Sequence, residues 1–303
     1  MPAPSTATSQ LSELDSNVVC TQWLAQAGHA GNCRGKTRMG QGQAPEGQAP
    51  QGRLFRKLLP ATQLPRLEAE AEGLAALALV AGELVLPRVH GCGLVAGGTQ
   101  AELLLEWLDL SGGGSAGWAA LGGGLAQMHR RGSGEAFGWR GDRFIGAGPQ
   151  LGGWSENWGQ FFAERRLAPQ FALAAQRGLH WSGSGALLQR LPTWLNGHGA
   201  EPVLVHGDLW AGNAGVLADG RGSLFDPAVS FSDREVDLAM AQLFGGFPPT
   251  FFDAYNSEWP LSVGHRQRRD IYNLFHLLNH ANLFAGGYRQ QCTALIEALL
   301  ALD

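Results

Sequence analysis

The feature that most constrains this chain is a loop in which an aspartate and an asparagine stand five residues apart, with a second aspartate thirteen residues later. Asp208 and Asn213 follow one short apolar stretch, and Asp226 ends the next. A phosphoryl transferase needs this set, because one carboxylate accepts the hydrogen bond of the attacking hydroxyl while hard oxygen atoms hold magnesium. The spacing therefore predicts Asp208 as the catalytic residue, with Asn213 and Asp226 as metal ligands.

Each of these residues has a plainer interpretation when it is taken alone. Asp208 and Asn213 could cap a turn, and Asp226 could be a turn residue before a proline. The apolar stretches 203–205 and 223–225 suit the two short strands of a hairpin. This strand, loop and strand context favours the phosphoryl-transfer interpretation over three unrelated turns.

Composition and charge argue against several other classes of protein. The 303 residues carry a formal net charge of -4, which lacks the basic excess of proteins that bind nucleic acid. No signal sequence is recognisable at the start, and no apolar run approaches the length of a membrane span. The four cysteines are scattered and indicate neither a zinc site nor a disulfide framework. We therefore expect a cytoplasmic enzyme without nucleic-acid or membrane partners.

The first third of the sequence reads as a small lobe built around one helix. Strands are expected at residues 53–59 and 103–108, and the stretch 64–79, rich in Ala, Leu and Glu, is a strong helix candidate. A further helix is expected at 17–27. The stretch 28–52, rich in Gly, Gln, Ala and Pro, reads as a low-complexity loop.

A larger and mainly helical lobe is expected after a glycine-rich connector at residues 111–115. Apolar residues then recur at helical spacing, over residues 118–129, 158–176, 186–195, 235–243 and 266–284. The pattern predicts an α+β fold with a nucleotide-binding lobe at 1–108 and a lobe carrying the catalytic loop at 109–303.

The residues around the catalytic loop carry a more specific pattern. Residues 206–213 read HGDLWAGN, and further stretches of the same kind lie at 137–167, 234–240, 243–247 and 277–284. The pattern resembles the fructosamine kinase (ketosamine-3-kinase) family, a branch of the aminoglycoside-phosphotransferase-like kinases, whose motif is H-G-D-L-W-x-G-N. The resemblance extends from about residue 53 onward and implies a protein-kinase-like fold of two lobes.

The resemblance also implies roles for residues of the small lobe. Lys57 stands where the family has the strand lysine that binds the α- and β-phosphates, and Glu70 stands where its helix partner lies. Glu68 and Glu72 are rivals for that partner. The connection between lobes, whose backbone would bind adenine, falls on Glu106, Trp107 and Leu108. An exposed lysine, surface glutamates and an ordinary buried strand are the plainer interpretations.

Two departures from the family pattern concern the strand that carries Lys57. The compact glycine turn that precedes this strand in the family is replaced by the longer stretch 28–52, so whether a loop there covers the phosphates stays open. Arg56 stands where the family usually has an apolar residue. Cys33 lies in the long stretch beside two basic residues, which would favour its thiolate, although an unreactive thiol is the plainer interpretation.

Four residues near the proposed site receive separate interpretations. Trp210 is expected at the acceptor, because aromatic faces stack on sugar rings and this residue is two positions from Asp208. His206 is expected to bond the loop backbone. Asp237 is expected to be a buried acceptor for amides of the catalytic loop, and His129 to be structural.

The resemblance implies ATP and Mg²⁺ as cofactors. It further implies that the acceptor is the 3-hydroxyl of a ketosamine, fructosamine or ribulosamine, on a small molecule or a protein lysine. The phosphorylated adduct would then fall apart and free the amine. Two alternatives stay open, a kinase of the same fold for an aminoglycoside or choline-like acceptor and a nucleotide-binding pseudokinase module. Retention of Asp208, Asn213 and Asp226 argues against the second.

Overall fold

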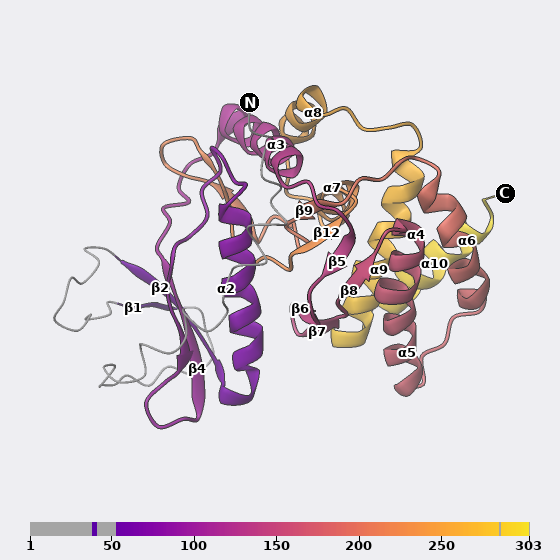
Figure 1. The fold of residues 1–303 in the computed structure, drawn as a ribbon, viewed down its shortest axis with the longest axis horizontal. Helices are drawn as coiled ribbons and strands as arrows, with labels where there is room; N and C mark the ends of the chain where they lie inside the picture. Colours follow the sequence, from indigo (N-terminus) through magenta and orange to yellow (C-terminus); the bar gives the residue numbers. More distant parts are fainter. Residues whose placement is uncertain (1–37, 41–52, 285, 303) are drawn as a thin grey trace.

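A computed structural model describes residues 38–40, 53–284 and 286–302, which form a small lobe and a large lobe (Figure 1). Strand β4 (Gln100–Glu106) is the last element of the small lobe, and helix α3 (Gly114–Arg131) is the first of the large one. The predicted boundary between residues 108 and 109 lies in the connection between these two elements.

The small lobe is one antiparallel sheet with a single long helix against it. The strands lie in the order β1 (Arg38–Gly40), β2 (Leu54–Pro60), β4 and β3 (Val89–Leu94). Helix α2 (Leu64–Ala78) follows a 3-10 turn, η1 (Ala61–Gln63), and has a proline in its first turn, where no amide partner is needed. The apolar stripe of this helix packs onto the sheet with Leu67, Leu74, Cys92, Leu103 and Leu105. This core confirms the predicted helix and its two neighbouring strands.

The charge of Arg56 is paired with an acidic residue of the same sheet. The guanidinium of Arg56 lies 2.6 Å from Oε2 of Glu102. In the register of β2 and β4, Arg56 is opposite Leu104 while Leu58 is opposite Glu102. Arg56 and Glu102 are therefore diagonal neighbours on one face, the geometry in which opposite charges stabilise a strand pair.

The large lobe contains a four-stranded sheet and a separate two-stranded sheet formed by β10 (Ala214–Val216) and β11 (Gly222–Leu224), and here one expectation was wrong. Strands β9 (Val203–Val205) and β11 were expected to pair, but β9 pairs with β12 (Ser230–Ser232) and β11 pairs with β10. The physical reason is the Asp219–Gly220 turn, where Gly220 has φ +89° and closes a tight hairpin between β10 and β11. Strand β12 then adds to β5 (Phe137–Trp139), which pairs with β8 (Gly153–Ser155).

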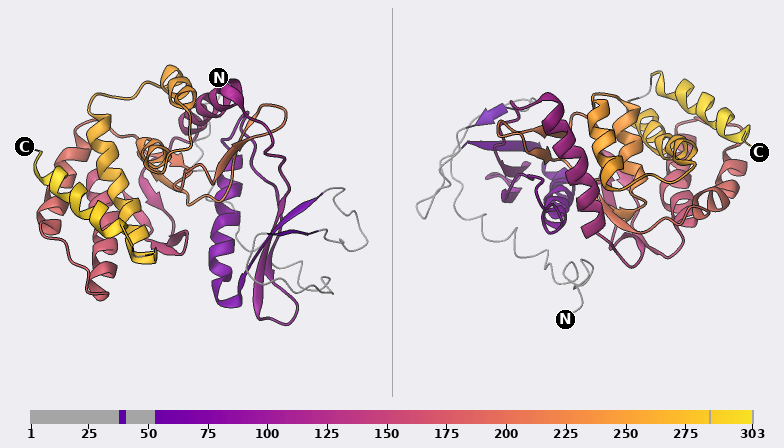
Figure 2. Two further views of the ribbon diagram at one scale, coloured as in Figure 1. Left: turned by 180° about the vertical axis from the view of Figure 1, so that it is seen from behind. Right: turned by 90° about the horizontal axis from the view of Figure 1, so that it is seen from above.

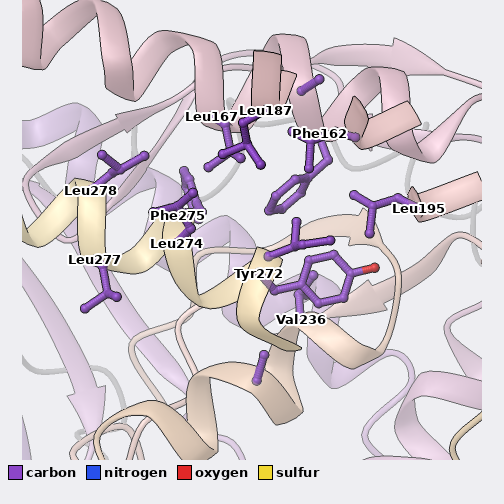
Figure 3. Close-up of a cluster of buried hydrophobic side chains, with 14 of the residues drawn as sticks. Phe162, Leu167, Leu187, Leu195, Val236, Tyr272, Leu274, Phe275, Leu277 and Leu278 are labelled. Atoms are coloured by element: carbon purple, nitrogen blue, oxygen red, sulfur yellow. The ribbon is translucent and has the colours of Figure 1, made fainter. Parts of the chain in front are cut away.

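Helices enclose the rest of the large lobe around two apolar clusters, one of which is drawn in Figure 3. Two further strands, β6 (Arg143–Ile145) and β7 (Gly148–Gln150), form a hairpin beside α2. The stretch expected as one helix at 158–176 contains a π turn. The helical elements are α4 (Trp158–Phe162), the π turn η2 (Ala163–Leu167), α5 (Ala168–Gln176), α6 (Ser184–Asn196), α7 (Glu235–Leu243), α8 (Pro249–Glu258), α9 (His265–Phe284) and α10 (Tyr288–Leu300).

The sequence led us to expect neither a membrane span nor a disulfide framework. Within the described ranges, no helix combines the length and apolar character that a membrane crossing requires. Cys92 and Cys292 are buried, and neither forms a disulfide within the described residues. Cys20 and Cys33, together with the helix expected at 17–27, lie outside the described residues.

Helix α3 contains three consecutive glycines, at positions 122–124, where it packs against its neighbours, which include α8 (Figure 2). A Cβ atom at Gly122 would lie 2.0 Å from the carbonyl oxygen of Phe251 in α8. A Cβ atom at Gly124 would lie 2.7 Å from Leu84. Around Gly123, by contrast, nothing lies within 4 Å of such an atom. The close contact with the α8 backbone therefore requires glycine at position 122. At position 123, glycine makes no such contact and only lowers the helix propensity of α3.

This contrast gives a matched pair of variants. Gly122→Ala should lower the free energy of unfolding by about 1–3 kcal/mol, because the α8 backbone must move away. Gly123→Ala should raise it by about 0.5–1 kcal/mol, because alanine restricts the unfolded chain and favours the helix. Urea denaturation followed by circular dichroism measures both changes. Equal effects of the two substitutions would contradict the close approach of α3 and α8.

Candidate active site

The loop after β9 brings the three residues of the predicted phosphoryl-transfer set together. The side-chain amide of Asn213 donates to the carbonyl oxygen of Asp208 at 2.9 Å and to its carboxylate at 3.2 Å. The same Nδ2 lies 3.4 Å from the carbonyl oxygen of Asp226. With its nitrogen engaged in this way, Asn213 keeps its side-chain oxygen as the atom suited to a cation.

The backbone of Asp226 adopts a conformation that aims its side chain. Among the described non-glycine residues, Asp226 alone has a positive φ, at +58°. Aspartate tolerates this left-handed region better than most residues, and such geometry is concentrated at functional sites. The preceding amide, of Phe225, donates to the carbonyl oxygen of Asn213 at 3.0 Å and so joins the loop to the end of β11.

Lys57 connects the small lobe to this loop. Its ammonium lies 2.8 Å from both carboxylate oxygens of Glu70 and 3.0 Å from Oδ1 of Asp226. The predicted partner glutamate is therefore Glu70. Glu68 is exposed on the same helix, and Glu72 bonds residues of the large lobe instead.

The charges at the site do not balance, since two carboxylates share one ammonium. Burial alone would lower the pKa of Lys57, but Glu70 and Asp226 outweigh burial and raise it. Burial, together with the charge of Asp226, raises the pKa of Asp208 to about 7. The hard oxygen donors of Asn213 and Asp226 and the excess negative charge fit a divalent cation such as Mg²⁺.

A buried aspartate accepts hydrogen bonds from the backbone of the catalytic loop. Asp237 of α7 accepts the backbone amides of His206 at 2.7 Å and Gly207 at 2.8 Å. Its Oδ2 also lies 3.1 Å from Nε2 of His129. Burial alone would raise the pKa of Asp237, but the hydrogen bond and charge of His129, followed by the charge of His206 and the amide of Gly207, lower it below its ordinary value. The expected roles of Asp237 and His129 are confirmed by this geometry.

His206 holds the loop as a neutral side chain. Its Nδ1 accepts the amide of Asp208 at 3.3 Å, so the proton belongs on Nε2, which donates to the carbonyl oxygen of Phe225 at 3.0 Å. Burial lowers the pKa of His206 below its ordinary value, despite the nearby charge of Asp237. The expectation that His206 bonds the loop backbone is confirmed.

The next member of this network was not expected from the sequence. The hydroxyl of Tyr255, in α8, lies 2.9 Å from Nδ1 of His129. Helix α8 was not expected, so neither was a tyrosine that fixes His129 from the other side. Its sequence, PTFFDAYNSE, lacks the sustained helical spacing of apolar residues that marked the other helices, and only the tertiary contact identifies its role.

Three residues in the connection between the lobes were proposed to bind adenine through their backbone. The amides of two of them are already engaged in backbone hydrogen bonds. The amide of Glu106 donates to Arg88 at 2.8 Å, and that of Trp107 donates to Arg53 at 3.2 Å. Within the described part of the chain, the amide of Leu108 makes no backbone hydrogen bond. Of the three residues predicted to bind adenine, Leu108 therefore keeps an available backbone donor, and adenine binding at Glu106, Trp107 and Leu108 stays a prediction.

Trp210 lies in the catalytic loop with 41% of its surface exposed. Its ring folds over Gly212, where a Cβ atom would be 2.2 Å from the ring. Trp139, Trp158 and Trp181 are instead buried, as expected of core aromatics. An exposed aromatic face next to Asp208 remains the predicted contact for the acceptor.

A second polar cluster in the large lobe has a structural explanation. The ligand atoms of His198, Asp233 and Glu235 lie within 4.8 Å of one another. Arg268 already bonds both carboxylate oxygens of Glu235, and the hydroxyl of Tyr272 donates to Asp233 at 2.6 Å. Because these carboxylates have protein partners, the cluster reads as a buried salt-bridge network.

Comparison with known proteins places the chain in a family. The model of the family described as fructosamine kinase matches residues 16–302. This protein belongs to the fructosamine kinase family. It is 42% identical over 248 residues to a protein of Synechocystis named a probable ketoamine kinase, covering 82% of this chain and 83% of that one.

Two further comparisons agree with this assignment. The chain is 35% identical over 241 residues to an Arabidopsis thaliana protein named protein-ribulosamine 3-kinase, chloroplastic, with 78% of this chain and 72% of that one covered. A Haemophilus somnus crystal structure named as a fructosamine-3-kinase superposes with a TM-score of 0.76 at 29% identity, covering 82% of this chain and 84% of that one. The expected protein-kinase-like fold is confirmed.

The support that Asp237 gives the catalytic loop can be tested by removing its charge. Asp237→Asn should lower the free energy of unfolding at pH 7 by about 2–3 kcal/mol, because charge-assisted hydrogen bonds to two amides are lost. Since the folded pKa is below its unfolded value of about 3.9, this stabilisation is present above that pH and is lost as the pH falls through the folded pKa.

Urea titrations of both proteins between pH 3 and pH 8 measure the difference. The exposed Asp253→Asn, on α8, is the control for loss of one surface charge. A gap between Asp237→Asn and the wild-type protein that stays constant down to pH 3 would contradict the assignment.

Proposed function

We propose that this member of the fructosamine kinase family transfers the γ-phosphoryl group of ATP to a sugar hydroxyl of a ketosamine, a fructosamine or ribulosamine, with the 3-hydroxyl as acceptor. The observation that carries the proposal is the convergence of Asp208, Asn213 and Asp226 with Lys57 at one site. Relatives named ketoamine kinase and ribulosamine 3-kinase support the acceptor class. The sugar would be attached to a small amine or to a protein lysine, and breakdown of the product would free the amine.

The nucleotide would lie between the lobes. Asn213 and Asp226 would hold Mg²⁺, which supplies neutralisation of the charge on the β- and γ-phosphates when it is bound. Lys57, whose ammonium bonds Glu70, would bind the α- and β-phosphates. The amide of Leu108 would donate to adenine.

Asp208 is the residue that accepts the proton of the acceptor hydroxyl. The hydroxyl oxygen forms a bond to the γ-phosphorus, the bond to the β–γ bridging oxygen breaks, and ADP leaves. The hydroxyl proton passes to the Asp208 carboxylate, whose raised pKa of about 7 suits a proton acceptor at neutral pH. Trp210 would stack against the sugar.

An acceptor panel tests the substrate class directly. With Mg²⁺ and ATP, ADP release should be seen with fructosyl-lysine or ribulosyl-lysine and be at least about 100-fold slower with kanamycin or choline, because a site that hydrogen-bonds one acceptor rejects others strongly. A coupled ADP assay measures the rates. Turnover confined to kanamycin or choline would contradict the ketosamine acceptor, and thermal stabilisation by ATP without ADP release would favour a nucleotide-binding module.

The role of Asp208 has its own test. Asp208→Asn should reduce kcat by at least about 100-fold, because the proton acceptor is lost. Binding of Mg²⁺ and ATP, measured by isothermal titration, should be retained. Asp219→Asn, in the exposed turn between β10 and β11, is the control. Unchanged turnover in Asp208→Asn would overturn its assignment.

A further inference from the structure

Helix α2 is tied to the large lobe by a glutamate that lies two residues beyond Glu70. Oε1 of Glu72 lies 2.6 Å from a guanidinium nitrogen of Arg140 and accepts the indole N–H of Trp139 at 3.2 Å. Oε2 of Glu72 pairs with Arg143. These three partners lie in β5, in β6 and in the segment between them. We call Glu72, Trp139, Arg140 and Arg143 the interlobe cluster.

A second contact holds the same turn of α2 against the large lobe. A Cβ atom at Gly73 would lie 3.1 Å from Pro227 and 3.4 Å from Val229. Pro227 immediately follows Asp226, so α2 lies directly against the chain that carries one predicted metal ligand. Figure 1 shows α2 between the small-lobe sheet and the β6–β7 hairpin.

The two glutamates of this helix therefore have different tasks. Glu70 bonds Lys57, whose ammonium also contacts Asp226, whereas Glu72 bonds the large lobe. If the interlobe cluster opened, α2 would lose the charged contacts that fix it against the large lobe, and Glu70 would have more freedom to move relative to Lys57. The placement of the phosphate-binding lysine thus depends on contacts that do not include it.

We propose that Glu72, with Arg140 and Arg143, is a positioning residue that holds α2 in place, so that the Lys57–Glu70 pair is formed before nucleotide binds. The side chain of Glu72 is 19% exposed and that of Arg143 is 20% exposed, so water screens this pair less than a surface ion pair. In protein kinases the corresponding helix is placed by phosphorylation of the activation loop. Here fixed charges of the chain do so.

The kinetic test rests on the proposed function. Glu72→Gln and Arg143→Gln should each lower kcat/KM for ATP about tenfold, because a charge-assisted contact that orders the site is lost. KM for the ketosamine should change by less than about twofold, because the residues proposed to contact the acceptor, Asp208 and Trp210, do not lie on α2. Glu68→Gln, which removes the same charge from an exposed position on α2, should leave both parameters near wild type.

The two substitutions should also depend on each other. The double variant Glu72→Gln with Arg143→Gln should lose less than the product of the two single losses, because both break the same contact. Arg143→Lys, which keeps the charge, should lose less than Arg143→Gln. Fully multiplicative losses in the double variant would overturn the proposal.

Hydrogen exchange provides a readout that needs no substrate. Without nucleotide, the amides of residues 64–78 should exchange about tenfold faster in Glu72→Gln than in the wild-type protein, while those of α9 keep their rates. Unchanged exchange of α2 would overturn the proposal, and so would equal acceleration in α9, which would indicate global destabilisation. Because this measurement is independent of turnover, a wild-type protein inactive on ketosamines would refute the proposed function and leave the test of Glu72 intact.

Discussion

The ammonium of Lys57, shared between Glu70 and Asp226, is the contact on which the rest of the site depends. It joins strand β2, helix α2 and the loop after β11, which come from both lobes. Removing one partner from such a group leaves a partly buried charge uncompensated, and that costs far more than the pair contributes. The arrangement therefore fixes the spacing of the lobes through electrostatics, and apolar packing serves to bring the three elements within reach.

The catalytic loop is fixed differently, by a chain of neutral and charged groups that never reaches the solvent. Close packing of α3 on α8 through Gly122 places Tyr255 beside His129. His129 in turn orients Asp237, which receives the amides of the catalytic loop. We therefore expect a packing error between α3 and α8 to be transmitted to the loop of Asp208 through these hydrogen bonds.

The sequence predicted which residues come together at the site better than it predicted the pairing of its strands. Asp208, Asn213 and Asp226 lie side by side as expected, because their spacing along the chain is local, while their catalytic and metal-binding roles stay predictions. Strands β9 and β11 were assigned to each other wrongly, because three apolar residues identify a strand but not its partner. The Asp219–Gly220 turn was the signal for the correct hairpin.

The glutamates of α2 that were considered as partners of Lys57 can be distinguished by their positions around the helix. The buried positions Leu67, Glu70, Leu74 and Leu77 are spaced three or four residues apart, which places Glu70 on the stripe that faces the sheet and leaves Glu68 exposed. Phase alone selects Glu70, because a carboxylate within an apolar stripe needs a buried cation. The partners of Glu72 had no comparable signal, since β5, β6 and their connection were not recognised as elements beside α2.

A helix that carries carboxylates toward both lobes also constrains how the enzyme can move. Separation of the two lobes must either break the interlobe cluster or carry α2 with the large lobe and strain the Lys57–Glu70 pair. Because the apolar stripe of α2 packs onto the small-lobe sheet while Glu72 and Gly73 contact the large lobe, either movement breaks contacts of this helix. The unit proposed to bind phosphate therefore cuts across the boundary between the lobes, because α2 packs on the small lobe and is bonded to the large one.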